Sequence, residues 1–276
     1  MKYPIGIQTF EELISEGYVY VDKTALVYRM VTEGKVYFLS RPRRFGKSLL
    51  ISTLESYFLG KKDLFKGLAM EQLEKEWAVH PVLRLSFSSS NFAQPNATEE
   101  ALRYFLHDYE QRYDLAPASS DLSLRFRGLL RGVHEKTGRK VVVLVDEYDK
   151  PLLDVLDLKQ PSHEADQSSA RTYEEHNRNV LKGFYGTFKD ADEHLRFVLL
   201  TGVTKFSQIS VFSGFNQPKD ISLDSRFEAI CGITGEELRQ VFHHSIEEMA
   251  AKFEVSFDEM VAKLTKKYDG TTSART

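Results

Sequence analysis

Two short groups of residues in this sequence have the types and spacing that phosphate chemistry requires. Gly46, Lys47 and Ser48 follow one another in the first group, and Asp146 and Glu147 form the second. Glycine lets a backbone approach a ligand closely. Lysine supplies a positive charge, and hydroxyl and carboxylate oxygens are ligands for a hard cation such as Mg²⁺. The two groups together predict a site for a polyphosphate and its magnesium ion.

The first group nearly matches the phosphate-loop pattern G-x-x-x-x-G-K-[ST], with Arg41 where the first glycine would stand. In such a loop, backbone N–H groups and the N-terminus of the next helix surround the phosphates. We expect Lys47 to reach the β- and γ-phosphates and Ser48 to bind Mg²⁺. The predicted nucleotide-binding residues are Arg41, Pro42, Arg43, Arg44, Phe45, Gly46, Lys47, Ser48 and Leu49.

Arg41, Arg43 and Arg44 give this loop a cluster of positive charge. Guanidinium groups suit the geometry of phosphate oxygens, so the three side chains could neutralise a bound nucleotide. The alternative is a basic turn before a helix, with the arginines solvated or bound to a partner acid or a nucleic-acid backbone.

The second group follows the apolar run 141–145, which has the length and composition of a strand buried on both faces. Ligands bind at the carboxyl ends of strands in open α/β sheets, so this is a Walker B pattern. We expect Asp146 to hold Mg²⁺, and Glu147 to orient and deprotonate the attacking water. An exposed acidic turn at the end of a strand is the alternative.

Polar residues also follow the apolar run 195–200. In ATPases with an additional strand beside Walker B, a residue at this position contacts the nucleophilic water. Thr201 is the first candidate and Thr204 the second, with local hydrogen bonding as the alternative. An arginine that stabilises transition-state charge is also expected, in cis or from a neighbouring subunit. Arg226 is the candidate, with a surface ion pair as the alternative.

Strand and helix patterns alternate along most of the chain, which predicts an α/β fold with a mainly parallel sheet. Residues 157–169 are polar and predict a surface loop, and residues 216–224 look irregular. Capping boxes at Thr234 and Ser256 open helical stretches. We therefore expect an α/β core over 1–233 and a helical segment over 234–276. The expected strands are 35–41, 82–87, 141–145 and 195–200, and the expected helices are 47–58, 98–113, 123–136 and 173–189.

The composition excludes some broad classes. The net charge is −3 and the pI is about 6.3, which argues against a protein that coats nucleic acid or a membrane surface. The one cysteine, Cys231, cannot form a disulfide within the chain. No run of residues has the apolar length that spans a bilayer, and the first residues lack a secretory signal pattern. These features predict a cytoplasmic protein without a membrane partner.

The chain resembles the bacterial AAA-ATPase-like proteins, in which a P-loop ATPase domain is usually followed by a PD-(D/E)XK nuclease-like region. The first P-loop position is arginine in that family too, so Arg41 fits it. The resemblance implies a P-loop three-layer sandwich of the additional-strand type, with ATP and Mg²⁺ as ligands. It also suggests that Asp22, Lys23 and Thr24 lie near the nucleotide, with a helix cap as the alternative. The segments that carry the resemblance are 20–24, 41–48, 145–151, 201–206 and 231–234.

The same resemblance implies that the helical lid is truncated at the C-terminus and that the nuclease-like region is missing. The expected function is an ATPase module that couples Mg-ATP binding and hydrolysis to a conformational change of a partner or of a missing C-terminal effector. Two alternatives stay open: a nucleotide-dependent switch that does not hydrolyse ATP, and a nucleic-acid-binding module that uses the arginine cluster. The expected partners are ATP, a nucleic acid or protein effector, and a second copy of the chain.

Overall fold

A computed structural model describes residues 2–88, 90–94, 96–157, 164–204 and 218–268. Within them a single parallel sheet has the strand order β2-β3-β4-β1-β5. Its strands are β1 Val36–Ser40, β2 Val82–Ser86, β3 Val141–Asp146, β4 Leu195–Gly202 and β5 Lys219–Asp220. Because all strands run the same way, their carboxyl ends meet at one edge of the sheet.

Helices cover both faces of the sheet, as the side chains of β3 show. Val141, Val143 and Val145 belong to one apolar cluster, whereas Val142 and Leu144 belong to another. Alternate residues of a strand point to opposite faces, so β3 has to be apolar throughout. The result is a three-layer sandwich, which confirms the predicted fold class.

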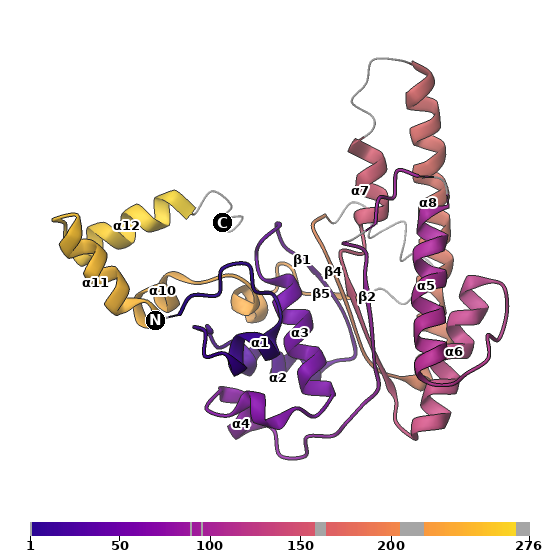
Figure 1. Ribbon diagram of the computed structural model, residues 1–276, viewed down its shortest axis with the longest axis horizontal. Coiled ribbons are helices and arrows are strands. Elements are labelled where there is room, and N and C mark those ends of the chain that lie inside the picture. Colours follow the sequence, from indigo (N-terminus) through magenta and orange to yellow (C-terminus); the bar gives the residue numbers. More distant parts are fainter. Residues whose placement is uncertain (1, 89, 95, 158–163, 205–217, 269–276) are drawn as a thin grey trace.

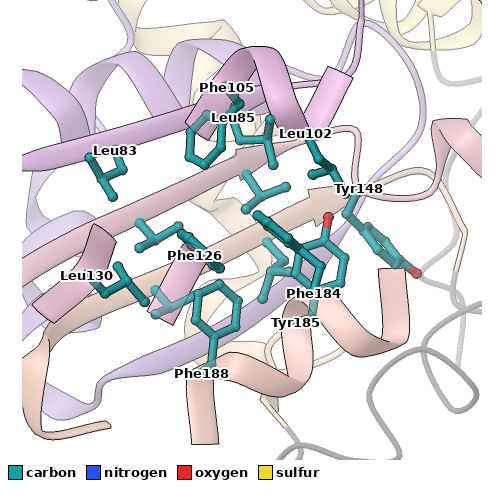
Figure 2. Packing of buried hydrophobic residues seen from close by; sticks show 14 of the residues in the cluster. Leu83, Leu85, Leu102, Phe105, Phe126, Leu130, Tyr148, Phe184, Tyr185 and Phe188 are labelled. Atoms are coloured by element: carbon teal, nitrogen blue, oxygen red, sulfur yellow. The ribbon is translucent and has the colours of Figure 1, made fainter. Parts of the chain in front are cut away.

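One face carries α5 Ala97–Arg112, α6 Leu122–Thr137, α7 Lys150–Asp157 and α8 Glu164–Asp190. Figure 1 shows α5, α6 and α8 side by side on this face. Aromatic side chains fill the space between helices and sheet (Figure 2). Phe126 and Phe184 stack with ring centroids 4.3 Å apart, which joins α6 to α8.

The opposite face carries α1 Phe10–Ser15, α2 Thr24–Glu33, α3 Lys47–Phe58 and α4 Ala69–Leu73, with the short helix η1 Lys62–Phe65 (Figure 1). Helix α3 follows the phosphate loop and is the most deeply packed of them. Its Leu50, Ile51 and Leu54 meet Leu144 and Leu199 of the sheet. The packing holds the first turn of α3 beside the carboxyl ends of β1 and β4.

The position of β4 fixes the fold type. It pairs with β1 on one side and with β3 on the other, so it separates the strand before the phosphate loop from the strand that ends in Asp146. A strand inserted there is the additional strand that the sequence predicted. Its carboxyl end therefore faces both halves of the predicted site.

The predicted strands and helices are confirmed within a few residues, but two segments differ. The surface loop predicted for 157–169 was wrong in part, because α8 already begins at Glu164 and so starts before the predicted 173. Residues 158–163 lie outside the described part. The polar composition of 164–169 suggested a loop, yet glutamate, alanine and glutamine also have high helix propensity. Within the predicted irregular stretch 216–224, β5 adds a two-residue edge strand.

The last described residues form three helices, α10 Gly235–Val241, α11 His243–Lys252 and α12 Phe257–Tyr268, which lie beside the sheet layers in Figure 1. Both predicted capping boxes are present, at Thr234 and at Ser256. The three helices share a small apolar cluster of their own that includes Ile246 and Met260. None of the described helices has the length and apolar character needed to span a membrane.

Candidate functional site

The phosphate loop leaves β1 after Ser40 and enters α3 at Lys47. Gly46 caps the helix with φ 85°, and Arg44 also has a positive φ of 65°. Glycine adopts this left-handed conformation without the steric cost that a side chain brings. A Cβ added at Gly46 would meet no atom within 4 Å, so open space lies beside the start of the helix. Free N–H groups at a helix start favour an anion.

Lys47 folds back over its own loop. Its Nζ donates hydrogen bonds to the carbonyl oxygens of Arg41 at 2.9 Å and Pro42 at 3.0 Å, and only 6% of the residue is exposed. Burial lowers the pKa of Lys47, and the negative charges of Asp146 and Glu147 oppose that shift. The ammonium group therefore lies between the loop and the acidic end of β3, where it can exchange carbonyl oxygens for phosphate oxygens.

Asp146 and Thr201 are bonded to each other across β3 and β4. The Thr201 hydroxyl donates to Asp146 Oδ1 at 2.7 Å, and both residues are buried. A hydroxyl has one hydrogen to donate. In this conformation Thr201 therefore orients the Asp146 carboxylate and has only lone pairs left for a water molecule. The structure joins these two predicted residues and gives Thr201 a partner that its position in the sequence did not reveal.

Glu147 occupies a strained turn at the end of β3. Its φ of 56° is unusual for a residue with a side chain, and such conformations persist where the surroundings enforce them. The residue is half-buried. Burial and the neighbouring Asp146 charge raise the pKa of Glu147, while Lys47, Lys150 and Arg43 act in the opposite direction. A carboxylate with a raised pKa is a stronger base, as removal of a proton from water requires.

These groups lie at the carboxyl ends of β1, β3 and β4. Comparisons with known proteins identify the family of the chain. A family model described as "Predicted AAA-ATPase" matches residues 4–212. The chain belongs to this AAA-ATPase-like family. A protein of Azotobacter chroococcum mcd 1, described as "Uncharacterized protein in vnfD 5'region", is 43% identical over 244 residues. That alignment covers 87% of this chain and 45% of the other protein. No solved structure matches the chain significantly.

Arg41, the residue that replaces the first loop glycine in this AAA-ATPase-like chain, binds protein carbonyl groups. Its Nη1 donates to the carbonyl oxygens of Ser222 at 2.6 Å and Ser40 at 3.1 Å, and its Nη2 donates to that of Glu228 at 3.5 Å. Arg43 and Arg44 are exposed. Of the three arginines, Arg41 thus ties the loop to the segment after β5, and the other two are accessible to a ligand.

Arg41→Ala is expected to lower the free energy of unfolding by about 2 kcal/mol, because hydrogen bonds from a charged donor to buried carbonyls contribute on that order. Urea denaturation of the purified protein measures the change. Arg43→Ala is the matched control and should change stability by less than about 0.5 kcal/mol. Equal stability of the two variants would contradict the tethering role of Arg41.

If Glu147 is the general base of ATP hydrolysis, its raised pKa predicts an acid limb in the pH dependence of turnover. A general base must be ionised, so activity is present above the pKa of Glu147 and is lost as the pH falls through it. Because that pKa is raised, the loss occurs at a higher pH than for a glutamate at about 4.3. Rates with saturating Mg-ATP from about pH 4 to about pH 8 test this. A rate that stays constant down to the pKa of an ordinary glutamate would contradict it.

Two further predicted residues, Arg226 and Thr204, bond to residues outside the group of Lys47, Asp146, Glu147 and Thr201. Arg226 pairs with Asp224 at 2.5 Å and with Glu33 at 3.3 Å, and Glu33 precedes β1. Within one chain Arg226 is therefore at the other end of β1 from the phosphate loop. Thr204 donates to Asp149 at 3.0 Å.

Asp22 and Thr24 have local partners. Asp22 accepts hydrogen bonds from Thr24 and from the backbone of Ala69, so it holds the starts of α2 and α4 together. Lys23, by contrast, reaches the helical segment and pairs with Glu237 at 2.5 Å. The motif over 20–24 is thus a helix cap with one long-range ion pair.

Two features of the site escaped the sequence interpretation. Gly232, with φ 82°, lies so close to the Phe45 ring that an added Cβ would be 3.2 Å from it. The backbone after η3 Ser225–Ile230 therefore packs on the phosphate loop, and burial raises the pKa of the adjacent Cys231 to about 11. The second feature is Asp149, which is almost fully buried. Asp149 is part of segment 145–151, which carries the family resemblance, but its contacts form only in the folded chain.

Proposed function

We propose that this chain binds Mg-ATP at the phosphate loop and hydrolyses it to ADP and phosphate. The observation that carries the proposal is the position of four residues, Lys47, Asp146, Glu147 and Thr201, at the carboxyl ends of β1, β3 and β4. Two of them, Thr201 and Asp146, are joined by a hydrogen bond of 2.7 Å. Membership in a family of predicted ATPases supports the same chemistry at a coarser level.

The donor groups of the site fit a magnesium ion and a triphosphate. Ser48 is the second residue of α3 and Asp146 is the last residue of β3, so a hydroxyl and a carboxylate are available at the carboxyl edge of the sheet. In the proposal these two residues hold Mg²⁺, which supplies positive charge to the phosphates. Lys47 would leave the carbonyl oxygens of Arg41 and Pro42 for the β- and γ-phosphates. The open space at Gly46 would admit the phosphates against the helix start.

Glu147 would act as the general base. It accepts one proton from water while the water oxygen forms a bond to the γ-phosphorus. The bond between that phosphorus and the β–γ bridging oxygen breaks, and its electron pair stays with ADP. Thr201 would keep the Asp146 carboxylate in place for the metal.

We also propose how hydrolysis could change the conformation of the chain. Helix α7 begins three residues after Glu147. Lys150 of α7 donates to the carbonyl oxygen of Ser90 at 3.0 Å and pairs with Asp154 at 2.5 Å. Asn177 of α8 donates to the carbonyl oxygen of Pro151 at 2.8 Å. A shift of the Glu147 turn on hydrolysis would therefore move α7 and α8 together and could be passed to a protein or nucleic-acid effector, or to a second copy of the chain.

The deciding experiment measures phosphate release and Mg-ATP binding by the wild-type chain. Turnover together with binding supports the proposal. Binding without turnover would identify a nucleotide-dependent switch. Nucleic-acid binding that falls with salt, disappears in an Arg43→Ala, Arg44→Ala double variant and ignores nucleotide would favour the third alternative. A role for Arg226 in a neighbouring subunit predicts that the rate per chain rises with protein concentration and that Arg226→Ala removes this rise.

A further inference from the structure

Asp149 joins the Glu147 turn to the end of β4. Its Oδ2 accepts hydrogen bonds from the backbone N–H of Val203 at 2.9 Å, the backbone N–H of Thr204 at 2.7 Å and the Thr204 hydroxyl at 3.0 Å. Only 1% of the residue is exposed. Three donors on one carboxylate oxygen form a strong attachment, because hydrogen bonds to an ionised acceptor exceed those to a neutral one.

The second oxygen of Asp149 is not satisfied by any described residue. Oδ1 is buried and has no hydrogen-bond partner there. The chain also leaves no space at this point: a Cβ added at Gly202 would lie 2.8 Å from Oδ1 and 2.4 Å from the Tyr148 ring. A buried carboxylate with an unsatisfied oxygen is costly in free energy. An apolar residue at this position would avoid that cost. The hydrogen bonds that Oδ2 accepts therefore point to a role for Asp149.

The hydrogen bonds accepted by Oδ2 are part of a group of hydrogen bonds made by the residues on both sides of Glu147. On one side of it, Asp146 accepts from the Thr201 hydroxyl. On the other side, the backbone N–H of Tyr148 donates to the Thr201 carbonyl at 2.9 Å, and the Tyr148 hydroxyl donates to the Thr204 carbonyl at 3.0 Å. Tyr148 lies at the edge of the buried cluster in Figure 2. Every neighbour of Glu147 in this turn is thus bonded to β4 or to the two residues after it.

We propose that Asp149 is a positioning residue for ATP hydrolysis. It locks Val203 and Thr204 to the β3–α7 turn and thereby holds Glu147 in its left-handed conformation, next to the Thr201–Asp146 pair. The proposal rests on the proposed ATPase function, since it assigns Asp149 a part in orienting the base and the metal ligand. It gives no contact between Asp149 and the nucleotide.

The test compares Asp149→Ala, Asp149→Asn and the control Asp121→Ala. Asp121 is the matched control because its carboxylate also accepts two backbone N–H groups, from Ser123 at 3.0 Å and Leu124 at 2.9 Å, but does so at the exposed start of α6. Asp149→Ala should lower kcat by about tenfold to a hundredfold with KM within about threefold, since a displaced catalytic group costs rate on that scale. Asp149→Asn keeps an oxygen acceptor and should recover most of the rate. Asp121→Ala should retain the wild-type kcat.

Thr204→Val keeps the proposal testable if Asp149→Ala does not fold. It removes one of the three bonds, and should lower kcat by a few-fold, whereas Thr204→Ser should restore it. Equal kcat in Asp149→Ala and Asp121→Ala, or a change in KM alone, would overturn the positioning role.

Amide hydrogen exchange at Val203 and Thr204 separates this inference from the proposed function. Faster exchange in Asp149→Ala than in wild type supports the attachment whatever the turnover. A wild-type chain without turnover would remove the proposed ATPase function and the catalytic role of Asp149 with it. Wild-type turnover combined with unchanged exchange and unchanged kcat in Asp149→Ala would overturn the inference alone.

Discussion

Glu147→Gln is expected to lower the rate of ATP turnover by about a hundredfold or more, because an amide cannot accept the proton of the attacking water. The change keeps the size of the side chain. It also removes a negative charge beside the phosphates, so Mg-ATP affinity should be unchanged or slightly higher. Phosphate release under saturating Mg-ATP measures the rate, and calorimetric titration measures the affinity.

Glu193→Gln is the control for this change. Glu193 lies just before β4, at the opposite end of that strand from Thr201, and its side chain is 82% exposed. It should keep the wild-type rate and affinity. Turnover by Glu147→Gln within about twofold of wild type would exclude Glu147 as the base, while a matching loss in both variants would indicate an effect on folding.

Lys47→Ala is expected to weaken Mg-ATP binding by about a hundredfold, or about 2.7 kcal/mol. The ammonium group of Lys47 is buried, and its hydrogen-bond partners are two neutral carbonyl oxygens. A group in that state gains strongly when phosphate oxygens replace carbonyl oxygens. Turnover should fall with the binding, because the nucleotide is no longer held.

Lys136→Ala provides the comparison for Lys47. Lys136 pairs with Asp114 on the surface and its side chain is 46% exposed. Calorimetric titration of both variants with Mg-ATP should show weaker binding for Lys47→Ala only. A thermal unfolding curve checks that Lys47→Ala is folded. Equal affinities of a folded Lys47→Ala and the wild type would place the nucleotide elsewhere.

Much of the fold could be predicted because local patterns carry it. The run 141–145 is apolar at every position since helices cover both faces of β3, and that requirement is visible in the sequence. The capping boxes at Thr234 and Ser256 involve residues three apart, so their residue types alone identify them. The pairing of a loop ending in Lys47 with a strand ending in Asp146 also followed from order and spacing.

The sequence alone did not determine which groups of the site touch. Thr201 donates to Asp146, Asp149 holds Val203 and Thr204, and Arg41 holds Ser222. Each of these bonds joins residues far apart in the chain. The bonds of Asp146 and Asp149 depend on β4 lying beside β3, and the bond of Arg41 depends on β5 lying beside β1. Strand order is set by the packing of both helical layers together, so no local pattern encodes it. The sequence by itself identified the candidate residues for phosphate chemistry, whereas the tertiary structure decided which of them contact one another.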